Sequence, residues 1–220
     1  MKKVSVVIPC YNAAGYLDKC IEQLLNQTIG IDNIEIILVD DASTDGEETR
    51  NLIRKYEEQF PNTVLAVFLA ENMRQGGARN AGVFYAKGEY LTFCDADDWL
   101  LEEALEHAYD TAKKYNADIV AFARKETGER DVHMSLEKGS GNKFFELSEV
   151  EKKRKFLLNM DEEGYSSQNK LFRLSLLHEK HIAFAEHLIM EEPSFVLPVR
   201  LYAERYYYLD EKLYVYYLST

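Results

Sequence analysis

Apolar runs and helical periodicities alternate along the first half of the chain. Four short runs, apolar at consecutive positions and rich in β-branched residues, predict strands at 4–9, 34–41, 63–70 and 89–94. Between these runs, apolar residues recur at the spacing of a helix, as at Leu17, Ile21, Leu24 and Leu25. Strands that are apolar on both faces need cover on both faces. The pattern therefore predicts an α/β fold with a mostly parallel central sheet flanked by helices.

The second half of the chain is less regular. Segment 118–126 predicts a strand, whereas 148–159 and 191–204 predict helices. A polar, glycine-bearing stretch at 128–143 predicts a loop or a loose hairpin. The aromatic segment 205–219 predicts two strands around the polar residues Asp210, Glu211 and Lys212.

Polar residues follow three of the predicted strands at the point where each strand ends. Asn12 follows the first strand, Asp40 and Asp41 end the second, and the fourth runs into Asp95, Asp97 and Asp98. Ligands of parallel sheets bind beyond the carboxyl ends of the strands. Carboxylates from separate strands should therefore converge on one rim, where a ligand can bind.

Length and charge restrict the classes of function. A chain of 220 residues with a hydrophobic fraction of 46% can bury a core. No repeat or low-complexity linker divides it, so we expect one domain over residues 1–220. The formal net charge of −12 argues against nucleic acid as a partner, because phosphate binding needs clustered Lys and Arg. A ligand that carries phosphates would need another attraction, of which a metal ion is the obvious one.

The cysteines and the N-terminus favour a soluble, cytoplasmic protein. Cys10, Cys20 and Cys94 form no CxxC pair, and two of them lie in apolar runs, which is typical of buried, reduced thiols. The first apolar run follows two lysines, but Pro9 and Asn12 interrupt it and it is too short for a signal peptide. No later run approaches the length that crosses a bilayer.

Four motifs in order resemble the nucleotide-binding half of inverting glycosyltransferases of family 2, which have the GT-A (Rossmann-like) fold. They are VSVVIPCYNAAGYLDKCIEQLLNQT, IEIILVDDASTDGEET, ENMRQGGARNAG and GEYLTFCDADDWL. The later segments NKLFRLSLL and IMEEPSFVLPVRLYAERYYYLDEKLYVYY resemble the family's acceptor side. The resemblance implies a nucleotide-sugar-binding part over 1–100 and a smaller acceptor-binding part over 101–220. Members of the family commonly continue past the position of Thr220.

The crowded carboxylates match the D-x-D pattern of this family. The resemblance implies that Asp97 ligates a divalent cation, Mn²⁺ or Mg²⁺, while Asp95 lies against the ribose or supports the metal through water. Hard cations prefer carboxylate oxygens, which agrees with this role. The simpler interpretation is a cluster that caps the following helix, and we expect this role of Asp98.

Further residues of the donor site follow from the same resemblance. Asp41 stands where the family accepts the N–H of a uracil base. In PCYN we assign Pro9 and Tyr11 to the nucleotide-sugar site, and Tyr11 stands where related enzymes stack on the base. A lone tyrosine outside such a motif would more simply be ordinary packing. Arg79 could reach the pyrophosphate, with glycines letting the backbone approach at a helix N-terminus.

The base that deprotonates the acceptor is expected in the segment MEEPSF. The family places a Glu-Asp pair here, followed by an aromatic position, and this chain has Glu191, Glu192 and Phe195. We assign Glu192 as the base, with Glu191 as the alternative. Glu is one methylene longer than the usual Asp, and base geometry is demanding. Two surface glutamates in the first turn of a helix, beside Pro193, are the simpler interpretation.

The resemblance thus implies metal-dependent transfer of a sugar from a nucleotide diphosphate sugar to a hydroxyl of a glycan or lipid-linked acceptor. A UDP-sugar is the expected donor. Two other classes stay open: a non-catalytic module that binds a nucleotide sugar or glycan, and a sugar nucleotidyltransferase. The glycine-rich N-terminal loop of the latter is absent from VVIPCYNAAGY. The basic run Lys152 to Lys155 could contact anionic lipid headgroups at the inner face of a membrane, although a solvated helix face is the simpler interpretation.

Overall fold

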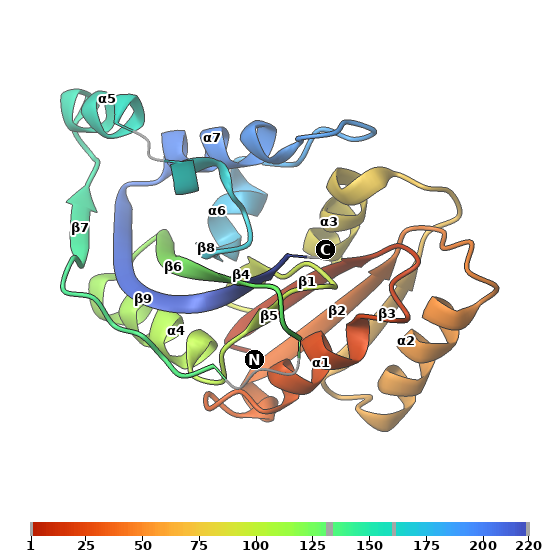
Figure 1. Ribbon diagram of the computed structural model, residues 1–220. Helices are drawn as coiled ribbons and strands as arrows, with labels where there is room; N and C mark the ends of the chain where they lie inside the picture. Colours follow the sequence, from red (N-terminus) through yellow and green to blue (C-terminus); the bar gives the residue numbers. More distant parts are fainter. Residues whose placement is uncertain (1, 131–133, 160–161, 219–220) are drawn as a thin grey trace.

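The computed structural model describes residues 2–130, 134–159 and 162–218, which form a sheet with helices on both sides (Figure 1). The strands are β1 (Val4–Cys10), β2 (Ile34–Asp40), β3 (Val64–Phe68), β4 (Tyr90–Phe93), β5 (Trp99–Leu100), β6 (Ile119–Thr127), β7 (Lys143–Glu146), β8 (Lys170–Arg173) and β9 (Arg205–Tyr217). The α-helices are α1 (Leu17–Leu25), α2 (Glu48–Gln59), α3 (Arg74–Tyr85), α4 (Ala104–Tyr115), α5 (Val150–Leu158), α6 (Leu174–Glu179) and α7 (Glu192–Tyr202). Short 3₁₀ helices span Ile31–Asn33 and Glu162–Tyr165.

The four strands predicted from the first half form the parallel part of the sheet. Their order is β3-β2-β1-β4, and every neighbouring pair is parallel. Successive residues of β1 alternate between two apolar cores: Val6 and Ile8 pack on the side of α1 and α4, and Val7 packs on the side of α3. Burial of both faces explains the continuous apolar runs, and the predicted α/β fold is confirmed.

The second half extends the same sheet with mixed pairing. Strand β8 is antiparallel to β4, β6 is antiparallel to β8, and β9 is parallel to β6. The parallel arrangement is thus concentrated in the first half. Because the sheet is continuous, side chains from the second half can reach the carboxyl ends of β1, β2 and β4.

The prediction of two strands in the aromatic segment was wrong. Strand β9 is one continuous strand, which Figure 1 shows as a strongly curved ribbon. Its register with β6 shifts around Asp210 and Glu211, so the polar residues form a bend and not a turn. Partners outside β9 hold this bend: Gly141 donates its N–H to Asp210 at 2.9 Å, and Lys138 pairs with Glu211 at 3.0 Å.

Other predicted elements agree with the structure. Strand β6 and helices α5 and α7 lie where the sequence predicts them. Part of the predicted loop at 128–143, residues 131–133, lies outside the described residues. The three cysteines are buried and free. No helix in the described part of the chain combines the length and apolarity needed to span a bilayer.

Candidate active site

A cavity of about 650 Å³ opens at the carboxyl ends of β1, β2 and β4. Its walls come from the segments after these strands, from the start of α3 and from the loop before α7. The lining residues are Pro9, Cys10, Tyr11, Ala13, Tyr16, Asp41, Asn72, Arg74, Gln75, Asp95, Ala96, Asp97, Leu188, Ile189, Met190 and Glu191. Five of the seven predicted site residues, namely Pro9, Tyr11, Asp41, Asp95 and Asp97, therefore lie together.

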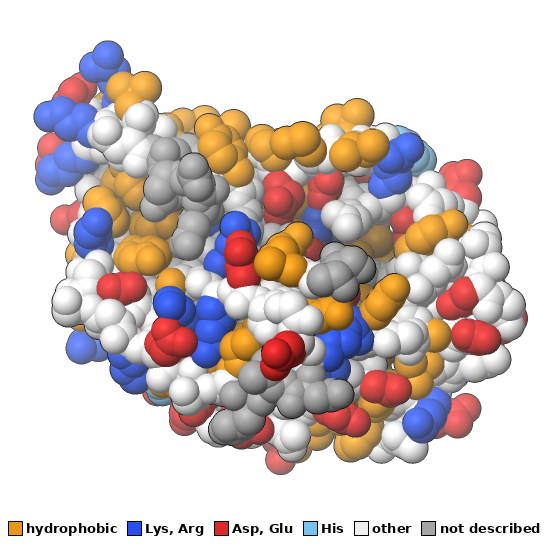
Figure 2. Space-filling model, viewed as in Figure 1, with side chains coloured by type: hydrophobic (Ala, Val, Ile, Leu, Met, Phe, Trp, Pro, Cys, Tyr) orange, Lys and Arg blue, Asp and Glu red, His pale blue; other side chains and the backbone are white. Residues whose placement is uncertain are grey.

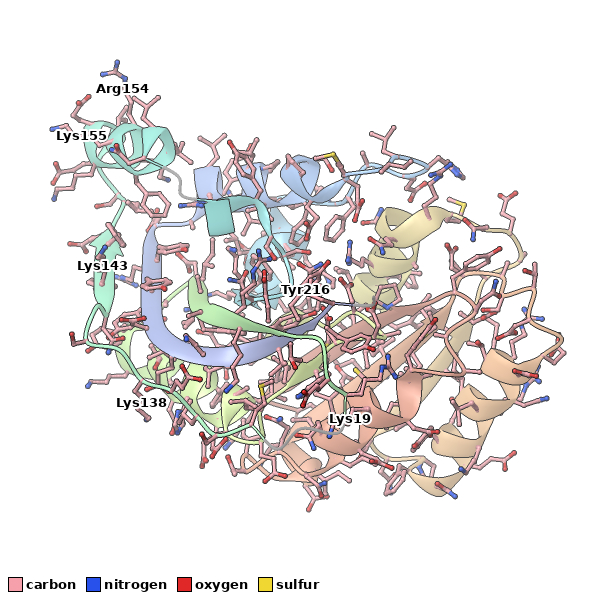
Figure 3. The ribbon with its side chains drawn as sticks, in the orientation of Figure 1. Lys19, Lys138, Lys143, Arg154, Lys155 and Tyr216 are labelled. Atoms are coloured by element: carbon pink, nitrogen blue, oxygen red, sulfur yellow. The ribbon has the colours of Figure 1, made fainter. Side chains whose placement is uncertain are left out.

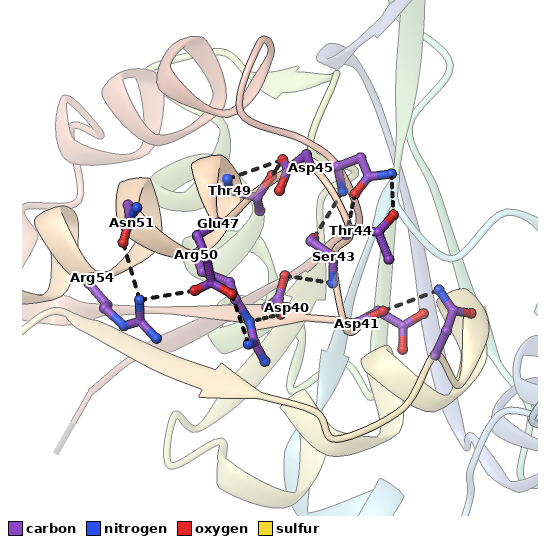
Figure 4. Close-up of polar contacts among 12 residues, drawn as sticks. Asp40, Asp41, Ser43, Thr44, Asp45, Glu47, Thr49, Arg50, Asn51 and Arg54 are labelled. Atoms are coloured by element: carbon purple, nitrogen blue, oxygen red, sulfur yellow. Dashed lines mark hydrogen bonds and ion pairs between the residues drawn. The ribbon is translucent and has the colours of Figure 1, made fainter.

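The segment after β2 is held rigidly, which orients Asp41. Asp40 is fully buried and forms an ion pair with Arg50 at 2.9 Å (Figure 4). Asp41 accepts the backbone N–H of Met73 through one carboxylate oxygen, at 2.7 Å. Burial raises the pKa of Asp41, and the nearby Asp40 adds to this effect, although backbone hydrogen bonds from Met73 and Arg74 oppose it. The carboxylate of Asp41 is thus a fixed acceptor in the cavity wall.

Tyr11 forms the adjacent wall beyond the end of β1. Its side chain is 49% exposed, and its hydroxyl lies 3.4 Å from Oγ1 of Thr44. Asn12, with a left-handed φ of 52°, donates its backbone N–H to Oγ of Ser43 at 3.0 Å. These contacts join the segments after β1 and β2, so that a half-exposed aromatic ring stands beside a fixed carboxylate.

The carboxylates after β4 have different surroundings. Asp95 accepts hydrogen bonds on both oxygens, from Arg79 and from Gln168, each at 2.7 Å. Asp97 is exposed at the cavity. Partial loss of water around Asp97 raises its pKa, and the negative charge of Asp95 raises it further.

Asp98 does not cap the following helix, and our prediction of that role was wrong. Its side chain is 1% exposed and accepts hydrogen bonds from the hydroxyl of Tyr214 at 2.5 Å and the backbone N–H of Tyr217 at 2.8 Å. Burial raises the pKa of Asp98 to about 7. Helix α4 begins further on, at Ala104. Asp98 therefore attaches the D-x-D segment to β9.

Arg79 lies behind the cavity wall. Its guanidinium is fully buried, pairs with Asp95 and Glu191, and lies 5.5 Å from the centre of the Phe184 ring. Arg74, exposed and at a left-handed φ of 60°, is the arginine that lines the cavity. In this conformation Arg79 connects two carboxylates of the wall and does not face the space for a pyrophosphate.

The glycines at the start of α3 serve the packing of this helix. A Cβ on Gly76 would lie 2.4 Å from the carbonyl oxygen of Ala185, and one on Gly77 would lie 2.3 Å from Cβ of Met73. The absence of side chains lets α3 approach the loop that carries Glu191. The sequence predicted that a ligand approaches the backbone closely here. In the structure the close neighbours of these glycines are Ala185 and Met73.

The two glutamates of MEEPSF have separate environments. Glu191 lines the cavity, is 4% exposed and pairs with the buried Arg79. Glu192, the first residue of α7, is partly buried and is not among the lining residues. Its Oε1 accepts two hydrogen bonds from Ser167, from the backbone N–H and from the hydroxyl, both at 2.8 Å.

Sequence reasoning missed Ser167 and Gln168, which connect the two halves of the site. Gln168 binds Asp95 after β4, and Ser167 binds Glu192 on α7. It also missed the exposed apolar residues Leu188, Ile189 and Met190, which form one wall. A run of apolar residues directly before the glutamate pair was the available signal. Met190 has a left-handed φ of 62°, and such backbones cluster at functional sites.

The carboxylates after β4 fit a cation for which the protein supplies only some of the ligands. Both oxygens of Asp95 are hydrogen-bonded, whereas Asp97 faces the cavity beside another negative charge, which a cation would compensate. Across the described ranges, no group of three or more His, Cys, Asp or Glu side chains is arranged to hold a metal ion. The residues therefore fit an ion whose remaining ligands are phosphate oxygens or water.

The fold is an α/β domain of the GT-A type, with a cavity lined by carboxylates at the carboxyl ends of its parallel strands. The family model described as Glycosyl transferase family 2 matches residues 5–179, and the chain belongs to this family. It is 32% identical over 96% of its length to a poly(ribitol-phosphate) beta-glucosyltransferase of Bacillus spizizenii.

Solved structures share the fold of this chain. A fragment of TarS from Staphylococcus aureus in complex with UDP-GlcNAc superposes with a TM-score of 0.81 at 27% identity, covering 99% of this chain. A mannosyltransferase of Pyrobaculum calidifontis in complex with GDP-Man and Mn²⁺ shares the fold, with a TM-score of 0.70, 20% identity and 97% of this chain covered. The chain spans 32% of the B. spizizenii protein, 59% of the TarS fragment and 56% of the mannosyltransferase.

Proposed function

We propose that this chain transfers a sugar from a UDP-sugar to a hydroxyl group of a glycan, in a metal-dependent reaction with inversion at the anomeric carbon. The observation that carries the proposal is the cavity in which Tyr11, Asp41 and Asp97 face one space from the ends of three strands. An aromatic face and a carboxylate acceptor suit a nucleobase, and a second carboxylate suits a cation on the diphosphate.

Each end of the donor has a candidate partner. Tyr11 stacks on the uracil, and Asp41 accepts its N–H, because its carboxylate is already fixed by the N–H of Met73. Asp97 holds the cation, and the exposed Arg74 supplies a positive charge on the same wall. A divalent cation at this site would neutralise the charge that develops on the leaving diphosphate. The TarS structures with UDP and UDP-GlcNAc support a UDP-linked donor.

Glu192 is the proposed base, and Glu191 is proposed to hold Arg79, and through it Asp95, in place. Glu191 balances the buried charge of Arg79, and using it as a base would leave that charge with Asp95 alone. The hydrogen bonds from Ser167 hold Glu192 through Oε1, on the turn directly beside the cavity. Glu192 would then take the proton of the acceptor hydroxyl as the hydroxyl attacks the anomeric carbon.

The acceptor is proposed to be a polyol phosphate polymer. The B. spizizenii relative is named a poly(ribitol-phosphate) beta-glucosyltransferase, and TarS is named a poly(ribitol-phosphate) beta-N-acetylglucosaminyltransferase. We further propose a donor part over 1–100 and an acceptor part over 101–220, with residues 188–191 of the second part also lining the donor cavity.

Calorimetric titration tests the donor site directly. UDP, GDP and CDP would each be titrated with and without Mn²⁺ into the wild type, Asp97→Ala, and Asp110→Ala as a control on the exposed surface of α4. We expect UDP to bind in the presence of Mn²⁺ and Asp97→Ala to weaken this binding at least tenfold, while Asp110→Ala has no effect. Equal binding by both variants would refute the assignment of the cation site.

Transfer assays separate the enzyme from the alternatives. Incorporation of labelled sugar from UDP-Glc or UDP-GlcNAc into poly(ribitol phosphate) is the expected result. Intact UDP binding without transfer to any acceptor would favour a non-catalytic binding module. Formation of a nucleotide sugar from a sugar phosphate and a nucleoside triphosphate would indicate a nucleotidyltransferase.

A further inference from the structure

A second cavity, of about 820 Å³, lies at the other end of α7 from the donor cavity. It is bounded by β7, α5, the second half of α7 and the start of β9. The lining residues are Lys143, Phe144, Phe145, Glu146, Leu147, Lys152, Lys155, Phe156, Asn159, Arg200, Tyr206 and Tyr208. We call this second cavity the α5–β7 pocket. None of its residues lines the donor cavity.

Aromatic rings form much of the wall of the α5–β7 pocket. Phe145 and Phe156 have ring centres 5.1 Å apart, and Phe156 and Tyr206 have ring centres 4.7 Å apart. Ring faces of this kind pack against the carbon skeleton of a sugar or polyol, and tyrosine adds a hydroxyl for hydrogen bonding.

The charge of the pocket is opposite to that of the chain. Among the described residues, three lysines and Arg200 line it together with one carboxylate, Glu146, although the whole chain carries −12. Lys152 is also paired with Glu149 at 2.8 Å, so part of its charge is compensated locally. Figure 2 shows Lys and Arg side chains gathered over α5 at the upper left of the molecule. A cationic pocket on an acidic protein gives an anionic ligand one favourable place to bind.

Helix α7 connects the two cavities. Glu191, directly before this helix, lines the donor cavity, and Arg200 near its end lines the α5–β7 pocket. At about 1.5 Å of rise per residue, these positions are roughly 14 Å apart along the helix. Figure 1 shows α7 passing across the top of the molecule between the two regions. A flexible polymer chain can therefore reach both cavities at once.

We propose that the α5–β7 pocket binds a phosphodiester-linked polyol segment of the acceptor, away from the hydroxyl that reacts. The lysines contact phosphates and the aromatic rings pack against the polyol carbons. This inference rests on the proposed function, because it takes the acceptor to be an anionic polyol phosphate polymer. The pocket would raise the affinity for long acceptors and leave the donor site unchanged.

The basic run on α5 allows a matched test of this proposal. Lys152 and Lys155 line the pocket, whereas Lys153 and Arg154 belong to the same run but do not. Figure 3 shows Arg154 extending outward from α5, away from β7 and Lys143. Lys152→Gln/Lys155→Gln and Lys153→Gln/Arg154→Gln each remove two positive charges, and each removes one ion pair within the helix, with Glu149 and with Glu151.

The experiment measures binding of purified poly(ribitol phosphate) to the wild-type chain and both double variants by biolayer interferometry. We expect the pocket-facing variant to bind roughly tenfold more weakly and to show a smaller salt dependence, because fewer phosphates are neutralised. The Lys153→Gln/Arg154→Gln variant should stay within about twofold of the wild type, because neither residue lines the pocket. Phe145→Ala provides a second variant that leaves all charges in place and removes a ring that faces Phe156 and Tyr206, and we expect it to weaken binding as well.

Three outcomes would overturn the proposal. An equal loss of polymer affinity in both double variants would indicate binding to a diffuse basic surface. Unchanged polymer affinity in both would exclude the pocket as the binding site. The wild type could instead bind phosphatidylglycerol vesicles and not the polymer, with both double variants binding the vesicles equally weakly. That result would make a membrane the partner of the basic run. Calorimetry with UDP and Mn²⁺ on the same variants keeps the proposals distinguishable, since the donor site should be unaffected whatever the polymer result.

Discussion

At the scale of single residues, one buried arginine determines how the carboxylates of the site divide their roles. Arg79 holds Asp95 and Glu191, and Gln168 occupies the other oxygen of Asp95. Asp97 and Glu192, the other carboxylates of these two motifs, form no ion pair with this guanidinium. The first prediction compares the two glutamates on this basis.

Glu192→Gln should abolish transfer and retain donor binding. The amide keeps an oxygen for the hydrogen bonds from Ser167 but does not accept the proton of the acceptor hydroxyl, so we expect a rate loss of roughly 100-fold or more. UDP affinity and melting temperature should stay close to the wild type. Steady-state transfer assays with calorimetry check this expectation.

Glu191→Gln should act mainly on stability. Removing its charge leaves the buried guanidinium of Arg79 with Asp95 as its remaining counter-charge, at a cost of about 3 kcal/mol. Chemical denaturation measures this loss. If Glu192→Gln transfers sugar normally while a fully stable Glu191→Gln does not, the base is Glu191.

At the scale of elements, the contact between α3 and β1 depends on a missing side chain. A Cβ on Gly82 would lie 2.2 Å from Cγ1 of Val7, whereas one on Gly15 would meet nothing within 4 Å. Gly82→Ala should therefore lower the free energy of unfolding by about 2 kcal/mol, and Gly15→Ala by less than about 0.5 kcal/mol. Equal denaturation midpoints for the two variants would contradict the packing of α3 on β1.

Helix α4 is tied to the sheet through a titratable group next to β4. Tyr109 and Lys113 donate hydrogen bonds to Glu89 at 2.8 and 2.6 Å. Burial raises the pKa of Glu89, but these hydrogen bonds outweigh it, and the net pKa lies below its usual value of 4.5. The stabilisation is therefore present above pH 4.5 and is lost as the pH falls through the lowered pKa.

Glu89→Gln should show this dependence. At pH 7 the variant should be less stable by up to about 1 kcal/mol, and the difference should narrow as the pH falls below 4.5. Thermal unfolding of both proteins between pH 7 and pH 4 measures it. A constant difference across this range would exclude the ionised carboxylate as its source.

At the scale of the whole molecule, the donor cavity is assembled from segments far apart in the sequence. Tyr11 and Asp41 come from one side, and the exposed residues Leu188, Ile189 and Met190 come from the other. UDP with Mn²⁺ should therefore slow hydrogen exchange in 186–190 as well as after β2. Helix α5 serves as the internal control and should not respond. Protection limited to the first half would place the nucleotide outside the cavity.

Much of the first half was predictable because its signals are local. A run that is apolar on both faces identifies a buried parallel strand, and the carboxylates that end β2 and β4 had to emerge at the same rim. Asp41 and Asp97 could thus be placed together from the sequence. The aromatic segment of β9 was harder, since alternation does not distinguish a bend from a turn, and partners such as Lys138 and Gly141 decide between them.

By itself, the sequence determined the α/β class, the family and the edge of the sheet that carries the site. These follow from apolar runs and motifs, which are patterns of residues close together in the sequence. Tertiary structure alone decided which carboxylates are engaged. Arg79 meets Glu191 across 112 positions, and Asp98 meets Tyr214 across 116. Such pairings depend on how distant segments pack, and no local pattern of charge specifies them.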